Sequence, residues 1–249
     1  MLMGEAVMVV AGAAMGLIMG SFLATIVLRW PRGQSVIVGR SKCDSCGNTL
    51  SPIELIPVLS YIRRGGRCRT CDVAINPVHP TMECGAALIG GVAMAIAPGW
   101  TGVAGAVFGW LLLTLAMLDL RHFWLPDALT AMLAISGVAT GLAGIGSQLT
   151  DRLWGGAAGF LSLYLIGAAY RLVRNREGLG GGDPKLLGAI GLWLGWQQLP
   201  IIILGASVVG LAYVGLKQLR GDIVTAIDRI PLGALIALVA FPVWLWQQI

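Results

Sequence analysis

The run GVAGAVFGWLLLTLAML, residues 102–118, is apolar except for Thr114, and an acidic residue, Asp119, follows it. It is long enough to carry a helix into a bilayer, which takes about 20 residues to cross. Seven more runs of this kind predict an all-α polytopic membrane protein with about eight transmembrane helices. Because the run at 186–198 is short, seven helices with a re-entrant segment are the alternative. The other six runs lie at 6–28, 82–98, 128–147, 153–170, 201–216 and 231–248.

The composition of the whole chain also indicates a membrane protein. Of the 249 residues, 57% are hydrophobic and only 12% are charged, a balance that a soluble domain of this size does not sustain. The first apolar run has no Lys or Arg before it, and its end near Leu28 lacks a small-residue cleavage site. We therefore expect a permanent anchor and not a removable signal peptide.

Lysine and arginine are distributed unevenly between the loops. Of the 17, eight lie in 29–80, four in 171–185, three in 217–230 and one at Arg121, which leaves only Arg152 elsewhere. Basic loops stay in the cytoplasm, so we expect both termini outside it, in the periplasm. The bias accounts for the net charge of +5, and it favours the lipid bilayer over nucleic acid as partner.

The segment 29–80 is polar and contains four of the five cysteines. We expect three parts: a first transmembrane helix at 1–28, a cytoplasmic domain at 29–80 and a transmembrane core at 81–249. About 50 residues bury little apolar surface, so such a domain needs a metal or disulfide staple.

Two CxxC pairs in this segment predict a structural zinc site with four thiolate ligands. Iron–sulfur or another metal is an alternative, and so are two disulfides, which a reducing compartment disfavours, or redox-active pairs. The fifth cysteine, Cys84, is expected to be a small buried apolar residue. The predicted ligands are Cys43, Cys46, Cys68 and Cys71.

Glycines recur at four-residue spacing in several apolar runs, as at Gly12, Gly16 and Gly20 or at Gly155 and Gly159. Small residues at this spacing allow helix backbones to approach closely in a membrane. We interpret them as intramolecular packing sites, and they predict no dimer.

Three aspartates lie beside apolar runs, where an ionisable group is costly and therefore a functional candidate. Asp119 closes the run at 102–118, and its structural alternative is pairing with Arg121 or His122. Asp127 follows Pro126 and is best explained as a helix N-cap. Asp183 precedes Pro184, which also matches an N-cap.

Capping does not explain the glycines before Asp183, which allow a close backbone approach. These are Gly178, Gly180, Gly181 and Gly182.

Asp119 and Asp183 form the predicted catalytic pair, with Gly180, Gly182 and Asp127 as supporting residues. Two carboxylates around one water can hydrolyse a peptide when one accepts a proton from water and the other donates to the carbonyl oxygen. From helix dipoles we expect Asp183, at a helix start, to ionise before Asp119, at a helix end. The chain has no GxSxG or HExxH motif, and its only histidines are His79 and His122.

Five segments resemble the type IV prepilin peptidase family in order along nearly the whole chain. They are GSFLATIVLRWPRG (20–33), CDSC (43–46), IPVLSYIRRGGRCRTC (56–71), LDLRHFWLPDALT (118–130) and GLGGGDPKLLGAIG (178–191). The last is similar to the GxGD signature of intramembrane aspartic peptidases. Two departures are Ala24, where the family commonly has Asn, and HPTMEC at 79–84, where a Tyr-Pro pair and a following Leu are more usual.

The resemblance implies a peptidase in the bacterial inner membrane that removes the short basic leader from prepilin or pseudopilin precursors at the cytoplasmic face, with Asp119 and Asp183 as catalytic pair. It also implies methylation of the new N-terminus with S-adenosylmethionine as cofactor, an activity of the cysteine-bearing domain. The residues themselves do not indicate where that cofactor binds.

Two other classes of protein compete with this interpretation. In an ion-coupled transporter or channel the three aspartates would line a cation path, and the zinc domain would regulate entry. Such sites usually lie near the membrane midplane, whereas these acids gather at one face. The third class is an assembly scaffold whose metal domain docks a cytoplasmic partner.

Overall fold

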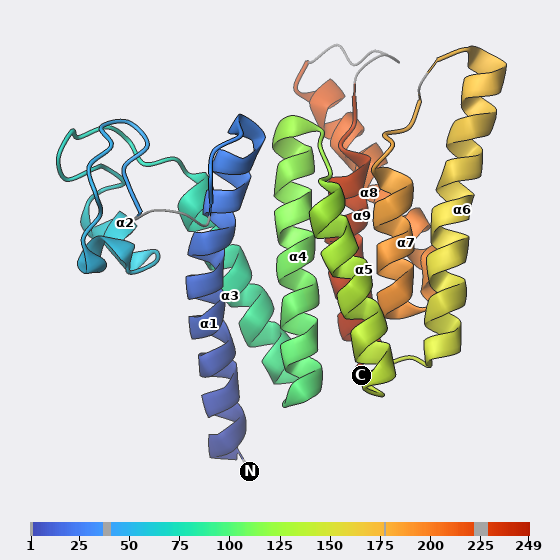
Figure 1. The fold of residues 1–249 in the computed structure, drawn as a ribbon, viewed down its shortest axis with the longest axis horizontal. Helices are drawn as coiled ribbons and strands as arrows, with labels where there is room; N and C mark the ends of the chain where they lie inside the picture. Colours follow the sequence, from blue (N-terminus) through green and yellow to red (C-terminus); the bar gives the residue numbers. More distant parts are fainter. Residues whose placement is uncertain (1, 37–40, 177, 222–228) are drawn as a thin grey trace. The chain divides into compact units, whose positions relative to one another are not determined.

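The computed structural model describes residues 2–36, 41–176, 178–221 and 229–249, and its regular elements in these ranges are all helical (Figure 1). Three of the elements are short 3-10 turns. Two isolated antiparallel bridges lie in the segment that contains the four clustered cysteines, residues 29–80, here called the cysteine segment. The elements are α1 (Leu2–Arg29), η1 (Trp30–Arg32), η2 (Pro52–Leu55), α2 (Leu59–Arg63), α3 (Val78–Ile96), α4 (Trp100–His122), α5 (Asp127–Leu142), α6 (Leu149–Arg174), α7 (Asp183–Leu194), η3 (Trp196–Gln198), α8 (Leu199–Leu219) and α9 (Leu232–Trp246).

The all-helical prediction is confirmed, and each predicted apolar run overlaps one of the helices α1 and α3–α9. Among the described residues, four helical segments are both long and apolar enough to span a bilayer. The structure therefore supports four spans by length and composition, and the larger number of eight remains a prediction. The four segments are Met3–Arg32, Trp100–His122, Leu149–Arg174 and Trp196–Leu219.

The boundary between α7 and α8 lies at Gly195, inside the short apolar run at 186–198. Gly195 has φ +86°, a backbone conformation that glycine adopts without strain. Pro200 lies in the first turn of α8, where its missing N–H needs no partner. With 12 residues, α7 is about 18 Å long, shorter than the roughly 30 Å hydrocarbon core.

The chain divides into two compact units, residues 1–114 and 115–249. In the first unit α1 packs along α3 through its glycines. A methyl group on Gly12 would lie 2.6 Å from the carbonyl oxygen of Gly90, and one on Gly20 would lie 2.5 Å from that of Met82. Gly16, between them, meets the Ala86 carbonyl in the same way. The predicted close packing of these glycines is confirmed within the chain.

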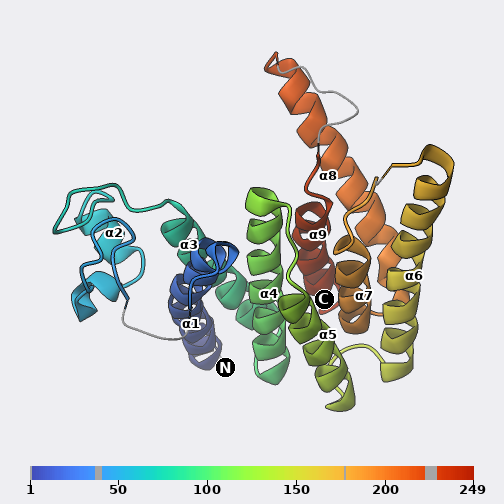
Figure 2. The ribbon, with the colours of Figure 1, turned by 45° about the horizontal axis from the view of Figure 1, so that its top comes forward.

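The second unit contains the end of α4 and helices α5–α9. Gly159 of α6 faces the Leu187 carbonyl of α7, at 2.7 Å from the position of an added methyl group. The indole N–H of Trp193 in α7 donates to the carbonyl of Leu133 in α5 at 2.8 Å, inside the unit. Figures 1 and 2 show α9 beside α7 and α8, and Figure 2 shows α8 continuing beyond the start of α7. Helix α7 is thus the buried centre of this unit.

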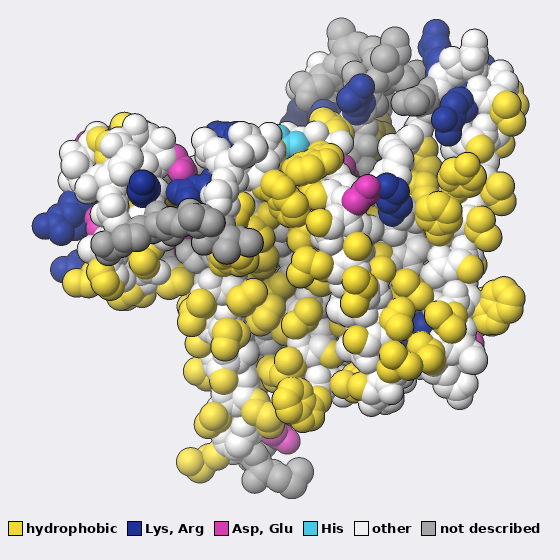
Figure 3. Space-filling view, viewed as in Figure 1, with side chains coloured by type: hydrophobic (Ala, Val, Ile, Leu, Met, Phe, Trp, Pro, Cys, Tyr) yellow, Lys and Arg dark blue, Asp and Glu magenta, His cyan; other side chains and the backbone are white. Residues whose placement is uncertain are grey.

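Arg152 is buried near the start of α6 and fastens the loop between α5 and α6. Its guanidinium donates to the carbonyl of Gly137 at 2.8 Å and to Thr140 Oγ1 at 2.9 Å. It also donates to the carbonyls of Ser147, at 2.9 Å, and of Ile145. A cation at the C-terminal end of α5 complements the partial negative charge of that helix end. Figure 3 shows hydrophobic side chains along α5 and α6, with Lys and Arg at the far end of α6.

We predict that Gly16→Ala lowers the free energy of unfolding by about 2 kcal/mol, because the added methyl group overlaps backbone atoms of α3. The matched control is Gly4→Ala, at a position in α1 with no neighbouring atom within 4 Å. Both changes improve helix propensity, so their difference isolates packing. The measurement is the thermal unfolding midpoint in detergent, and equal midpoints for the two variants would refute the close contact.

Candidate functional site

Asp119 lies in the last turn of α4 and is buried, with 5% of its surface exposed. Its Oδ2 accepts a hydrogen bond of 2.8 Å from the backbone N–H of Ala234, in the first turn of α9. Within the described part of the chain, no ion pair joins it to Arg121. The carboxyl group is therefore held by the start of another helix, 115 residues away in the chain.

Asp183 is the first residue of α7 and is buried to a similar extent, with 6% exposed. Its Oδ2 accepts a hydrogen bond of 3.1 Å from the N–H of Gly180, in the glycine loop that precedes the helix. The N-cap position belongs to Gly182, and no side chain caps α7. The capping interpretation of Asp183 is therefore wrong, because its side chain turns back to the loop.

The two carboxyl groups converge on Gly233, at the start of α9. The backbone N–H of Gly233 interacts with both of them, and the charge of Asp119 acts directly on Asp183. The fold thus brings together two acidic side chains that are far apart in the sequence. Three elements position them: the end of α4, the start of α7 and the start of α9.

Leu125 packs against the glycines on both sides of this pair. A methyl group on Gly182 would lie 2.8 Å from Leu125 Cβ, and one on Gly233 would lie 2.8 Å from Leu125 Cδ1 and 3.0 Å from Asp119 Oδ2. At Gly180 it would lie 2.9 Å from Asp183 Oδ2. The expected close approach at Gly180 and Gly182 is present, and only glycine fits this packing.

Gly233, Ala234 and Leu125 were not predicted from the sequence. The signal for the first two is the stretch IPLGA at 230–234, where a proline and a glycine open the last apolar run. The start of α9 lies at Asp119, so a helix N-terminus faces each of the two carboxyl groups. That Asp183 ionises before Asp119 stays a prediction.

Asp127 lies outside the pair. It is the first residue of α5, its side chain does not cap the helix, and the N-cap interpretation is therefore wrong. Its Oδ1 accepts from Lys185 Nζ at 2.6 Å, with 75% of the Asp127 side chain and 46% of the Lys185 side chain exposed. An exposed ion pair of this kind contributes little to stability.

The four cysteines of the first unit converge as predicted. Their sulfur atoms all lie within 4.8 Å of one another, and Cys43 Sγ lies 3.9 Å from Cys71 Sγ. Zinc–sulfur bonds of about 2.3 Å in a tetrahedron place sulfurs about 3.8 Å apart, so the cluster fits a four-thiolate metal site. The fifth cysteine, Cys84, is exposed, and the prediction that it is buried is wrong.

Each CxxC pair is formed by a turn of the same construction. In the first, the N–H of Cys43 donates to Asn48 and the N–H of Gly47 donates back to Cys43, both at 2.9 Å. In the second, the N–H of Cys68 donates to Val73 at 2.9 Å, and that of Asp72 donates to Cys68 at 3.1 Å. The fourth residue after the first cysteine has positive φ in both turns, +70° at Gly47 and +55° at Asp72.

The thiols of the cluster differ in pKa, because neighbouring N–H groups and sulfur atoms act on each of them differently. Backbone N–H groups of Cys71 and Thr70 donate to the Cys68 sulfur and lower the pKa of that thiol to about 7. At Cys71 the Val73 N–H acts in the same direction, but burial and the sulfurs of Cys46, Cys68 and Cys43 outweigh it and raise the pKa to about 11. A bound dication removes this conflict, because it stabilises all four thiolates together.

Fold and site together define a helical integral membrane protein with a buried acidic pair and a four-cysteine cluster. Residues 14–97 match the model of the bacterial peptidase A24 N-terminal domain, and residues 106–215 match that of the type IV leader peptidase family. No solved structure matches the chain.

Several relatives named prepilin leader peptidase/N-methyltransferase are similar to most of the chain. The relative from Aeromonas salmonicida is 39% identical over 214 residues, covering 85% of this chain and 73% of the relative. The Pseudomonas aeruginosa relative is 34% identical over 256 residues, covering 93% and 88%. The Burkholderia pseudomallei relative is 36% identical over 250 residues, covering 90% and 80%. The chain therefore belongs to the type IV leader peptidase family.

We predict that Gly233→Ala lowers the thermal unfolding midpoint by several degrees, because its methyl group overlaps Leu125 and crowds the Asp119 carboxyl group. The control is Gly215→Ala in α8, where no atom lies within 4 Å of the added group. Differential scanning calorimetry in detergent makes the comparison. A Gly233→Ala midpoint at or above that of the control would contradict the described contact.

Proposed function

We propose that this protein is a membrane aspartic endopeptidase that removes the short basic leader from type IV prepilins or pseudopilins and then methylates the new N-terminus. The observation that carries the proposal is the convergence of Asp119 and Asp183 on the Gly233 N–H. The names of the relatives support the same pair of activities.

The two carboxyl groups act on one water molecule in this mechanism. The ionised carboxylate accepts a proton from the water as the water oxygen attacks the scissile carbonyl carbon. The other carboxyl group, still protonated, donates its proton to the carbonyl oxygen. Repulsion between two carboxylates keeps one proton on the pair, so both groups titrate as a unit. The N–H groups of Gly180, Gly233 and Ala234 keep the carboxyl groups in position.

The arrangement of the second unit supports a cytoplasmic active site in the inner membrane. Asp119 lies in the last turn of α4, and basic residues occupy the same turn and the last turns of α6 and α8. Figure 1 shows these three helix ends, together with the starts of α7 and α9, at one end of this unit. Loops of this charge stay in the cytoplasm, which leaves both termini on the periplasmic side.

In the proposed topology the eight helices α1 and α3–α9 all cross the membrane, and the short α7 does so together with the turn η3 that follows it. The cysteine domain, residues 29–80, lies in the cytoplasm between the first helix, 1–28, and the peptidase core, 81–249. Zinc is the proposed structural metal, and S-adenosylmethionine is the proposed methyl donor. Prepilin or pseudopilin precursors and lipid are the partners, without nucleic acid.

A transporter or channel explains the same residues less well. A transport path needs polar groups near the midplane of the membrane. Asp119 and Asp183 lie instead at helix ends, and backbone N–H groups hold both of them.

We predict that Asp119→Asn and Asp183→Asn each reduce leader cleavage by roughly three orders of magnitude or more, as expected when one member of a catalytic unit is lost. Asp127→Asn retains a substantial fraction of activity, because Asp127 pairs with Lys185 outside the site. Purified protein in detergent is incubated with a precursor bearing a basic leader, and the products are separated by mass. Equal loss in all three variants would make the choice of this pair wrong.

For the metal, we predict about one zinc per chain in the wild type and its release when the four clustered cysteines are changed to Ser. The cysteine domain, residues 29–80, then becomes sensitive to limited proteolysis. Cys84→Ser, outside the cluster, keeps the metal. Metal content is measured by mass spectrometry, and zinc that persists in the fourfold variant rules out the site.

A further inference from the structure

The first unit contains a cavity of about 570 Å³ between the cysteine segment and the ends of α1 and α3 that face it. This volume is in the range of sites that bind small molecules and cofactors. Its lining combines side chains of opposite charge with hydroxyl and aromatic groups. They include Ser21, Thr25 and Arg29 of α1, Glu83 of α3, and Asp44 and Tyr61 of the cysteine segment.

Glu83 is a buried acid that lines this cavity, with 6% of its surface exposed. Its Oε2 accepts a hydrogen bond of 2.7 Å from the backbone N–H of Val58. Val58 has φ +58° and ψ −48°, and the N–H of Leu59 donates to the carbonyl of Pro57 across it. This is a γ-turn, which is strained for a β-branched residue. Strain of this kind persists where the surrounding structure holds a functional group in place.

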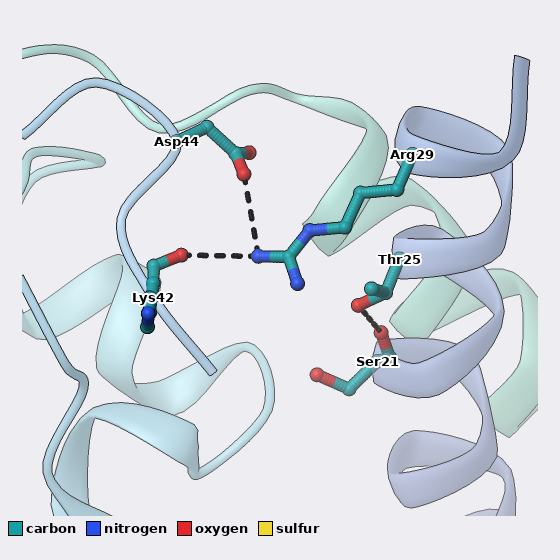
Figure 4. Close-up of polar contacts among 5 residues, drawn as sticks. All are labelled: Ser21, Thr25, Arg29, Lys42 and Asp44. Carbon is teal, nitrogen blue, oxygen red and sulfur yellow. Dashed lines mark hydrogen bonds and ion pairs between the residues drawn. The ribbon is translucent and has the colours of Figure 1, made fainter. Parts of the chain in front are cut away.

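Arg29 brings a cation to the same cavity. Its Nη2 lies 3.4 Å from Asp44 Oδ1 and 3.3 Å from the Lys42 carbonyl oxygen. Figure 4 shows both contacts on this one nitrogen, while the other guanidinium nitrogens make none with the residues drawn. In the same view Ser21 and Thr25 follow Arg29 along α1, one turn apart. The guanidinium therefore retains donors for a carboxylate.

The charges restrict the ligand. Six basic side chains line the cavity, and they repel a basic leader peptide. A purely anionic ligand, such as phosphate or a lipid headgroup, is repelled by the buried carboxylate of Glu83. A zwitterion satisfies both sets of charges, particularly one with a further cationic centre beside its amino-acid group.

We propose that this cavity binds the methyl donor S-adenosylmethionine, with Arg29 on its carboxylate and Glu83 and Asp44 on its cationic groups. The proposal rests on the methylation step of the proposed function. The donor supplies a methyl group: the amine nitrogen provides the electron pair of the new N–C bond, sulfur keeps that of the broken C–S bond, and one amine proton passes to water. Glu83 and Arg29 bind and orient the methyl donor. The catalytic pair of the second unit, Asp119 and Asp183, takes no part in the methyl transfer.

The test is isothermal titration of the full-length, zinc-loaded protein in detergent with S-adenosylmethionine. Glu83→Gln keeps an acceptor for the Val58 N–H but removes the charge, so we expect binding to weaken about tenfold or more. Binding of S-adenosylhomocysteine, which lacks the sulfonium charge, weakens less in the same variant. The matched control, Glu5→Gln in the exposed first turn of α1, binds as the wild type does.

Leader cleavage and zinc content are measured on the same samples. Glu83→Gln keeps wild-type cleavage, so loss of binding is separated from any failure of the peptidase proposal. If Glu83→Gln lowers the zinc content or the unfolding midpoint, its weaker binding could come from damage to the fold, and a second variant is needed. Thr25→Leu fills the cavity from α1 and must also weaken the binding of S-adenosylmethionine. Wild-type protein that binds no S-adenosylmethionine, or that binds only inorganic phosphate, overturns the proposal. Unchanged affinity in both variants does so too.

Discussion

The second unit depends on the first turn of α9, where the backbone meets two buried carboxyl groups. Buried acids need hydrogen-bond partners, because a carboxyl group taken from water without them is strongly destabilising. The N–H groups of Gly233 and Ala234 fulfil this need at Asp119, and the Gly233 N–H reaches Asp183 as well. The ends of α4, α7 and α9 must therefore meet at one point. Leu125 fills the remaining space only because residues 182 and 233 lack side chains.

Much of the fold could be predicted from the sequence, because continuous apolar runs indicate helices in a membrane. All eight runs overlap helices in the structure. What could not be predicted is where they divide and how they meet. Gly195 ends α7, whereas Pro200, the more conspicuous residue, is accommodated in the first turn of α8. The number of helices that cross the membrane also depends on the thickness of the bilayer. The hydropathy and length of a run therefore determine it only in part.

The site was predictable where side chains carry the chemistry and not where the backbone does. Asp119 and Asp183 stood out as acids beside apolar runs, and the four cysteines stood out by spacing. The only sequence signal for the N–H groups of Gly233 and Ala234 is the proline and glycine in IPLGA, at the start of the last apolar run. Asp127 and Asp183 have the neighbours of N-cap residues, yet each is the first helical residue, with its side chain bonded elsewhere. A proline beside an aspartate indicates a helix start but does not determine the side-chain rotamer.

The donors that hold the two acids, at Gly180, Gly233 and Ala234, all belong to the main chain. Their placement depends on the path of the polypeptide and on small residues at a few positions. Neighbouring side chains that face a bound leader are then free to diverge without loosening the acids. An enzyme built this way separates substrate preference from its hydrolytic machinery, so its preference can be redesigned one lining residue at a time.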